Sequence, residues 1–364
     1  MAMTNLDELL LSQWDRVVFF EPGVMRTRID DTIRRRVPGT LGLVVQFNPS
    51  HLKSKRPVDP LLAKPSTDET STKPKAMGFN FTLAKKEEFL CGLRFGMGDE
   101  HHLSLVQAID MRDARKEEPE HFVLVNVAPL VRGHMLFVLE LNRVKPQTMT
   151  KKFMQYALSI SQAIQRECFA LGFNSAGAWS SVNHFHLQGY FFPHIESRVS
   201  ANFPVATQVR DEMFRVGGVV VKHMLDWKTT CYVVEPEDSA SGGAHVVEIA
   251  WTLLELLQSQ SIPHNILIVG MTVFIFPRHA QCENGVGLFP DSASESDTSA
   301  TFAGRLRIAV AELAGLVIAG DSVVYDNLTE DMFNTILQKE VSLNASEEAA
   351  LMATWKEKLN ISMK

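Results

Sequence analysis

The chain has 364 residues, of which 45% are hydrophobic and 21% are charged. This balance is typical of a globular protein with a substantial core, built as one large domain or two ordinary ones. The net charge of -6 gives no overall attraction to nucleic acid or to an anionic membrane, so neither is expected as a partner.

The cysteine spacing indicates a reducing compartment, and the apolar segments indicate neither a signal peptide nor a membrane span. The four cysteines lie far apart and form no Cys-x-x-Cys pair, which argues against a zinc ribbon, a thioredoxin-like site and a disulfide framework. Residues 1–14 lack the basic start and long apolar core of a signal peptide. No apolar stretch approaches the roughly 20 residues of a membrane span. We expect a cytoplasmic protein, and access to the nucleus stays open.

The first two hundred residues contain short apolar runs and one helical segment. Apolar runs bounded by turn residues predict strands, and a stretch rich in Lys, Pro, Ser and Thr predicts a loop. Apolar residues at helical spacing, closed by Gly172, predict a helix. In chain order these elements are a strand at 41–47, a loop at 49–78, strands at 122–127 and 134–141, a helix at 151–171 and a strand at 182–192.

The remainder of the chain shows the same kinds of signal. A pair of apolar runs surrounds Gly270, and two segments are rich in Ser, Gly or acidic residues. Thr329 and Ser346 are candidate N-caps for the last two helices. The predicted elements are a loop at 235–244, a helix at 246–258, strands at 265–269 and 271–276, a loop at 284–301, and helices at 331–340 and 346–359.

The order of these elements predicts an α+β fold, because the strands form antiparallel groups and the helices pack on one face. The runs 122–139 and 265–276 resemble each other weakly, so we expect two related halves, each with an antiparallel sheet. We place the halves at residues 1–200 and 201–364, with the chemistry in the first. Neither of the Gly-rich phosphate-binding sequences that open a helix is present.

The segment 174–188 carries the strongest chemical signal, because His184, His186 and Gln188 occupy alternate positions. Alternate side chains share one face of a strand, so these three would point the same way. Imidazole is a nucleophile toward phosphorus near neutral pH, because much of it is unprotonated. We interpret His186 as a nucleophile that forms a nucleotidyl-histidine, with Gln188 and Ser181 donating hydrogen bonds to phosphate oxygens.

Two other interpretations of the paired histidines stay open. Histidines at i and i+2 on a strand are a common pair of metal ligands, but a third His, Asp, Glu or Cys would have to come from a distant part of the chain. The pair also fits structural histidines at the surface of a sheet.

The run 184–188 resembles the His-x-His-x-Gln motif of the transferase branch of the histidine-triad (HIT) superfamily, to which galactose-1-phosphate uridylyltransferase belongs. Residues 125–129, followed by Gly133 and His134, resemble the Asn-x-x-Pro…Gly-His segment of the same fold. The resemblance implies a HIT-like fold. It implies no cofactor, and it carries over no metal, because the chain has no cysteine pairs like those of the uridylyltransferase.

A closer resemblance, to the GDP-hexose phosphorylases, covers most of the chain. The segments that carry it are 6–11, 38–39, 46–48, 51–57, 79–82, 172–175, 263–268 and 312–315. It implies that His186 takes GMP from a GDP-hexose, releases hexose 1-phosphate, and passes the GMP to inorganic phosphate. His184 would then orient His186, and Gln188 and Ser181 would contact the α-phosphate.

Four further residues are weaker candidates. The resemblance implies nucleotide contact for Asn126 and a part in the site's architecture for Asn174. Lys55 and Arg56 suit phosphate binding by their charge and geometry, and they fit a solvated basic loop equally well. The chain departs from the family pattern at Leu316, where relatives commonly have histidine.

The sequence features disagree about which hexose the enzyme uses. The opening segment, Gln188 and the run 265–268 favour plant-like enzymes that act on GDP-L-galactose in ascorbate synthesis, whereas animal-like enzymes that act on GDP-D-glucose share 312–315. We take GDP-L-galactose phosphorylase as the leading expectation and GDP-D-glucose phosphorylase as its alternative. A nucleotide hydrolase and a catalytically weak guanine-nucleotide-binding protein are further hypotheses. Such enzymes are often dimers, so a homodimer is also expected.

Overall fold

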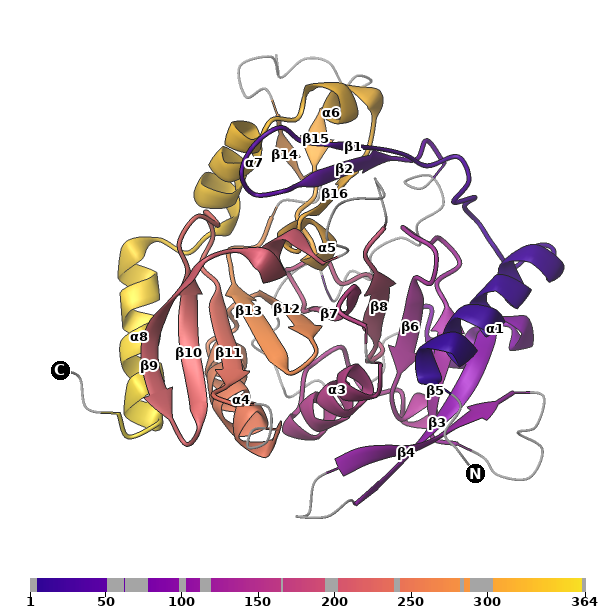
Figure 1. The fold of residues 1–364 in the computed structure, drawn as a ribbon, viewed down its shortest axis with the longest axis horizontal. Coiled ribbons are helices and arrows are strands. Elements are labelled where there is room, and N and C mark those ends of the chain that lie inside the picture. Colours follow the sequence, from indigo (N-terminus) through magenta and orange to yellow (C-terminus); the bar gives the residue numbers. More distant parts are fainter. Residues whose placement is uncertain are drawn as a thin grey trace.

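The computed structural model describes residues 5–50, 62, 78–97, 103–111, 119–164, 166–193, 202–238, 243–281, 285–288 and 304–361. Within these ranges one large sheet dominates (Figure 1). Its strands are β3 (Phe89–Met97), β4 (Leu103–Asp110), β5 (His121–Val125), β6 (Met135–Val138), β7 (Phe169–Asn174), β8 (Leu187–Phe191), β9 (Arg210–Val216), β10 (Val219–Met224), β11 (Tyr232–Pro236), β12 (His264–Val269) and β13 (Thr272–Pro277).

This sheet has the order β4-β3-β5-β6-β8-β7-β12-β13-β11-β10-β9. Every pair of neighbouring strands in it is antiparallel. The prediction of an α+β fold with antiparallel sheets is therefore confirmed. The two groups of strands are joined edge to edge, since β7 pairs with β12 in the middle of the sheet.

The strand order is symmetric about the central pair β7 and β12. Outward from the centre, β8, β6 and β5 on one side occupy the same places as β13, β11 and β10 on the other. The weak sequence similarity between 122–139 and 265–276 therefore joined the wrong elements, because the first run forms β5 and β6 and the second forms β12 and β13. The proposed boundary at residues 200 and 201 lies outside the described residues.

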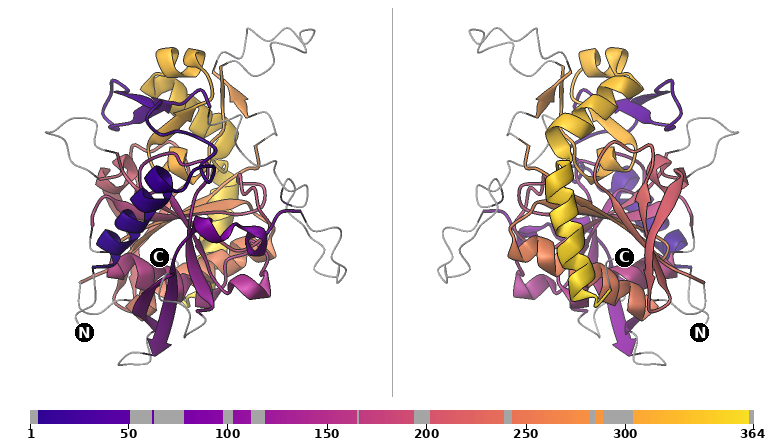
Figure 2. Two further views of the ribbon diagram at one scale, coloured as in Figure 1. Left: turned by 90° about the vertical axis from the view of Figure 1, so that its right-hand side faces the viewer. Right: turned by 90° about the vertical axis from the view of Figure 1, so that its left-hand side faces the viewer.

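The four longest helices share one hydrophobic core with one face of the large sheet. α3 packs beside α4, α4 contacts α8, and α1 contacts β3. Figures 1 and 2 show these helices along the sheet, away from the small sheet described next. Their bounds are Leu6–Phe20 for α1, Lys151–Ala163 for α3, Gly243–Ser259 for α4 and Ala345–Lys358 for α8.

The opposite face packs against a second core, which contains a three-stranded sheet in the order β1-β2-β16. Its parallel pair joins β2 from the N-terminal part to β16 from the C-terminal part. The expectation that helices cover only one face is wrong, because α5 contacts β7 and β12 from this second side. The bounds are Ile33–Arg36 (β1), Val44–Phe47 (β2), Val286–Gly287 (β14), Arg305–Leu306 (β15), Leu316–Ala319 (β16), Val310–Leu313 (α5), Ser322–Asn327 (α6) and Glu330–Ile336 (α7).

The central strands are apolar because both of their faces are buried. On β12, Ile266 and Ile268 belong to the core under the long helices, whereas Leu267 belongs to the core on the other side. Side chains alternate between the two faces of a strand. A strand covered on both faces therefore reads as a continuous apolar run rather than an alternating one.

This double burial explains the wrong boundary of the helix predicted at 151–171. The helix α3 begins after Thr150, whose side chain accepts a hydrogen bond from the N–H of Phe153, and it ends at Ala163. The rest of the predicted helix includes the start of β7, whose residues are all buried. An apolar run does not distinguish a buried strand from a buried helix by periodicity alone.

Other predicted boundaries hold in part. β2 occupies the second half of the strand predicted at 41–47, and the loop predicted at 235–244 begins inside β11. Thr329 caps α7 as predicted, but α8 is capped by Asn344 rather than Ser346. The loops at 49–78 and 284–301 lie mostly outside the described residues. No described helix is long and apolar enough to cross a membrane.

Candidate functional site

The two histidines lie in the connection between β7 and β8, not on the strand predicted for them. β8 begins at Leu187, so the strand prediction at 182–192 is correct only for its second part. Before it, the N–H of Phe185 donates to the carbonyl of Lys145, and the N–H of His186 donates to the side chain of Gln147. These bonds replace a strand ladder, and the prediction that all three polar side chains share one face is wrong: His186 and Gln188 line one cavity, and His184 does not.

A cavity of about 180 Å³ collects most of the predicted site residues. Its lining includes Asn126, Asn174, Ser181, His186 and Gln188. His184 does not line it and is fully buried. Lys55 and Arg56 lie outside the described residues. The structure therefore brings together every predicted site residue that it describes, except His184.

The His186 ring is oriented through its Nδ1 atom, which lies 2.8 Å from the carbonyl oxygen of His184. A carbonyl only accepts, so Nδ1 carries the proton and the lone pair of the neutral ring lies on Nε2. The backbone on either side is also fixed, because Gln147 accepts from the His186 N–H at 2.8 Å and donates to the His186 carbonyl at 3.0 Å. The sequence analysis missed Gln147, which lies 39 residues away along the chain.

His184 supports the site from behind rather than within it. Its Nδ1 accepts the backbone N–H of Phe81 at 3.1 Å. The Phe81 ring lies 5.5 Å from the His184 ring and 5.1 Å from the His186 ring. Burial lowers the pKa of His184 to about 4, so this imidazole is neutral at physiological pH. Its backbone carbonyl, not its side chain, makes the hydrogen bond that orients His186.

The amide of Gln188 is held in one orientation by its neighbours. Its Oε1 accepts the Tyr190 hydroxyl at 2.5 Å and lies 3.1 Å from Nε2 of His134. Nδ1 of His134 accepts the N–H of Leu130, so the neutral ring carries its proton on Nε2 and donates it to Gln188. Because Oε1 is the acceptor of both bonds, the NH₂ end of Gln188 is the donor left for a ligand. His134, which the sequence analysis named only as part of the family-like Gly-His pair, also lines the cavity and thus belongs to the candidate site.

Asn126 and Asn174 line the cavity with their carbonyl oxygens already engaged. Oδ1 of Asn126 accepts the N–H of Ala128 at 3.0 Å. Oδ1 of Asn174 accepts from Nδ2 of Asn265 at 2.6 Å and from the N–H of Val310 at 3.1 Å. Asn174 therefore ties the end of β7 to two segments of the C-terminal half, which fits an architectural part in the site.

The C-terminal half also supplies part of the cavity wall, although we expected the chemistry to lie in the first half. Arg307 and Glu312 line the cavity. The Arg307 guanidinium lies 4.9 Å from the centre of the Trp179 ring, which lines the same cavity. The indole N–H of Trp179 donates to Gln281 at 2.6 Å. None of these four residues was predicted as a site residue, although Trp179 and Glu312 lie in segments that the sequence analysis had marked.

Leu316, where the family pattern has histidine, lies on β16. It is buried, pairs with Val44 across the small sheet, and belongs to the second core. It is not among the residues that line the cavity, whereas Ile318 on the same strand is. The departure therefore falls in the packing behind the cavity wall.

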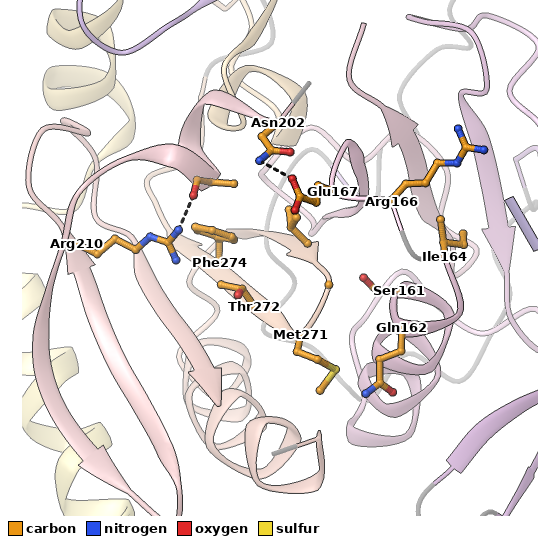
Figure 3. A pocket seen from close by; sticks show the side chains of 13 residues that line it. Ser161, Gln162, Ile164, Arg166, Glu167, Asn202, Arg210, Met271, Thr272 and Phe274 are labelled. Carbon is orange, nitrogen blue, oxygen red and sulfur yellow. Dashed lines mark hydrogen bonds between the residues drawn. The ribbon is translucent and has the colours of Figure 1, made fainter. Parts of the chain in front are cut away.

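A larger cavity, of about 570 Å³, lies elsewhere, between the end of α3 and the turn joining β12 to β13 (Figure 3). None of the predicted site residues lines it. Charged groups in its lining already have partners: Glu167 accepts a hydrogen bond from Asn202 at 3.3 Å, and Arg210 lies 2.8 Å from Glu235. Although this cavity has the greater volume, the chemistry favours the smaller one.

The metal-site interpretation gains no support from the part of the chain that is described. There, no three His, Cys, Asp or Glu side chains come together in a way that could hold a metal ion. The two histidines differ in orientation, since one faces the cavity and the other is enclosed.

Comparison with known proteins assigns the family. The family model described as "GDPGP1-like, N-terminal domain" matches residues 5–190, and "GDPGP1-like, C-terminal domain" matches residues 204–360. GDP-L-galactose phosphorylase 2 of Arabidopsis thaliana is 26% identical over 94% of this chain and 74% of its own length. GDP-D-glucose phosphorylase 1 of Danio rerio is 26% identical over 87% of this chain and 81% of its own length.

The fold has a solved relative. The crystal structure of yeast Ap4A phosphorylase Apa2 in complex with Ap4A has a TM-score of 0.56 to this chain. The match covers 93% of this chain and 98% of the yeast protein at 16% sequence identity, so it shows the shared HIT-like fold. The two family models together span both groups of strands and the cavity between them. The chain therefore belongs to the GDPGP1-like family, the family of the GDP-hexose phosphorylases, and is an enzyme of the nucleotidyltransferase type.

Proposed function

We propose that this chain is a GDP-L-galactose phosphorylase of ascorbate synthesis, which transfers GMP to inorganic phosphate through a guanylyl-histidine at His186. The observation that supports this most is the bond from Nδ1 of His186 to the carbonyl of His184. It places the nucleophilic lone pair on Nε2, in a side chain that lines the cavity. A fixed tautomer spares the enzyme the cost of orienting the nucleophile during the reaction.

In the first step, Nε2 of His186 bonds to the α-phosphorus and the bond from that phosphorus to the bridging oxygen breaks. The electron pair leaves on hexose 1-phosphate. The attacking ring becomes cationic, and its Nδ1 proton stays in place, where the carbonyl of His184 stabilises the charge. The NH₂ group of Gln188 and the hydroxyl of Ser181 would donate to the non-bridging oxygens.

In the second step, an oxygen of inorganic phosphate attacks the same phosphorus. The bond to Nε2 breaks, its electron pair returns to His186, and GDP is released. No proton has to move at His186 in either step, so its neighbours need only hold the ring. We propose nucleotide contact for Asn126 and an architectural part for Asn174. Lys55 and Arg56 remain proposals for phosphate binding.

The choice of hexose rests on the sequence. Relatives that act on either GDP-sugar are equally similar, at 26% identity. Gln188 and the run 265–268 favour GDP-L-galactose. GDP-D-glucose phosphorylase is the alternative with the same mechanism, and the two would differ only in the donor that reacts fastest.

The test is the mass of the intact protein after mixing with GDP-L-galactose or GDP-D-glucose in the absence of phosphate. We expect a gain equal to GMP, greatest with GDP-L-galactose, which phosphate then discharges as GDP. A clear preference for GDP-D-glucose would overturn the choice of hexose. Turnover that does not depend on phosphate would indicate a hydrolase. Tight GDP binding with neither adduct nor turnover would leave the binding-protein hypothesis.

A further inference from the structure

One cation stands out in the wall of the candidate site. Among the described residues that line this cavity, Arg307 is the only arginine or lysine. It forms no ion pair and no hydrogen bond with any described residue, in contrast to Arg278, which donates to Asn265 and to two backbone carbonyls. A half-buried guanidinium without a carboxylate partner retains its capacity to bind an anion.

The position of Arg307 is set by an aromatic platform. Its guanidinium carbon lies 4.9 Å from the centre of the Trp179 ring. Trp179 has a φ of 69°, in the left-handed region that a bulky residue rarely occupies. Gln281 holds this conformation, since its Oε1 accepts both the Trp179 indole N–H at 2.6 Å and the backbone N–H of Ile308 at 2.8 Å. Strain of this kind persists where the surroundings fix the residue, commonly at functional sites.

The same bonds join the platform to the cation. Gln281 accepts from Trp179 and from the residue next to Arg307, so the ring is fixed relative to the backbone that carries Arg307. A guanidinium near an aromatic ring keeps its edge N–H groups for other acceptors. Burial lowers the pKa of Arg307, because the charged guanidinium is partly removed from water. A bound anion would offset this cost.

We propose that Arg307 is the binding residue for the phosphate that is exchanged: the β-phosphate of the GDP-hexose and, after it leaves, the incoming inorganic phosphate. This rests on the proposed function and deepens it. Both displacements occur at one phosphorus and one histidine, so the leaving and the attacking oxygens occupy the same place. A single guanidinium therefore serves both steps.

This assignment accounts for phosphate rather than water as the acceptor. A phosphate dianion approaching an anionic guanylyl group is repelled, whereas water is not. The fork of N–H groups on Arg307 would bind two oxygens of the acceptor and offset that repulsion. Without it the guanylyl-enzyme would still form from a donor that lacks a β-phosphate, but phosphate would discharge it poorly.

The experiment distinguishes binding of the β-phosphate and of inorganic phosphate from the other functions of the site. Wild type, Arg307→Gln and Arg307→Lys are guanylylated with guanosine 5′-phosphorimidazolide, which carries no β-phosphate, and with the GDP-hexose. Discharge of the adduct is then followed against phosphate concentration. Arg305→Gln is the matched control, because Arg305 lies two residues away and donates to the carbonyl of Gly285 instead of lining the cavity.

For Arg307→Gln we expect guanylylation by the imidazolide at the wild-type rate. Guanylylation by the GDP-hexose should slow, and the phosphate concentration for half-maximal discharge should rise, each by about 10- to 100-fold. Arg307→Lys should recover part of this loss, and Arg305→Gln should match wild type.

Two results would overturn the assignment. In one, Arg307→Gln keeps the wild-type dependence on phosphate. In the other, it slows the imidazolide reaction as much as the GDP-hexose reaction, which would indicate a general disturbance of the site. If wild type forms an adduct with neither GDP-hexose and shows no phosphate-dependent turnover, the proposed function itself fails, and the assignment of Arg307 fails with it.

Discussion

The two halves differ most in how their central strand pairs are connected. In the N-terminal half, β7 and β8 are joined by residues 175–186, which contain both histidines. In the C-terminal half, β12 and β13 occupy the equivalent places and are joined only by Gly270 and Met271. The same arrangement of a helix followed by two strands (α3-β7-β8 and α4-β12-β13) therefore contains the candidate site in one half and only a tight turn in the other.

The longer connection is stable only because other parts of the molecule hold it. Its backbone lacks a neighbouring strand at His186, and Gln147 takes the strand's place. The shorter connection needs no such support, because β12 and β13 pair along their full lengths. The C-terminal half contributes instead through the groups that it lends to the cavity, such as Arg307. The first half thus carries the proposed nucleophile, and the second half supplies part of the cavity wall around it.

The largest expected effect comes from removing His186, the proposed nucleophile, from the longer connection. His186→Ala should abolish the guanylyl adduct and reduce turnover by at least about 10³-fold, because the two-step route is lost. The measurement is adduct mass together with kcat. His245→Ala, an exposed histidine at the start of α4, should keep full activity. An adduct that survives in His186→Ala would place the nucleophile elsewhere.

Gln147→Leu should loosen the long connection without touching the ligand. The His186 N–H and carbonyl lose their partners, so the ring is no longer held in position. We expect kcat to fall by up to about 100-fold, as a small misplacement of a reacting group can cause. Gln162→Leu, an exposed glutamine at the larger cavity, is the control. A loss of activity there instead would show that the wrong cavity was chosen.

Stability should depend on pH through buried histidines in both halves. Burial lowers the pKa of His184 in the long connection and of His264 on β12, each to about 4. Below its ordinary pKa of about 6.5 the unfolded chain binds these protons while the folded protein does not. The free energy of unfolding should therefore fall as the pH drops from about 6.5 to 4, and should not change through these groups above that window.

The variant His264→Asn isolates the contribution of His264 to the pH dependence of stability. An asparagine can retain a donor for the carbonyl of Ile262, which His264 Nδ1 contacts at 3.0 Å, but it does not titrate. We expect the fall in unfolding free energy across the window to shrink by about 2–3 kcal/mol, measured by urea denaturation at a series of pH values. An unchanged profile would mean that His264 binds its proton at the same pH in the folded and unfolded states, which would contradict the prediction.

The smallest effect should come from the partner of Gln188. Tyr190→Phe removes one of the two donors that fix the Gln188 amide and leaves His134 as the other. We expect kcat/KM to fall by about 3- to 10-fold, equivalent to the loss of one modest hydrogen bond. If kcat/KM does not change, His134 alone is sufficient to orient the amide.

Much of the fold could be predicted, because several helices and strands are specified by residues close together in the sequence. The helix α4 shows its apolar stripe, the turn at Gly270 separates two strands, and Thr329 caps α7. The boundary between α3 and β7 could not be predicted, since a strand buried on both faces has no alternation to reveal it. The pairing of β7 with β12 could not be predicted either, because local sequence does not encode which edges meet.

The sequence by itself determined the family and the segment that we propose to contain the nucleophile, because a short polar motif within an apolar run can be recognised without knowledge of the fold. Only the tertiary structure decided how that motif is used. It placed His184 behind the cavity, began β8 after His186, bonded Gln147 to the backbone of His186, and brought Arg307 to the cavity wall. These residues lie far from the motif along the chain and follow no periodicity. Their parts arise from contacts across the sheet, which form only when the whole chain folds.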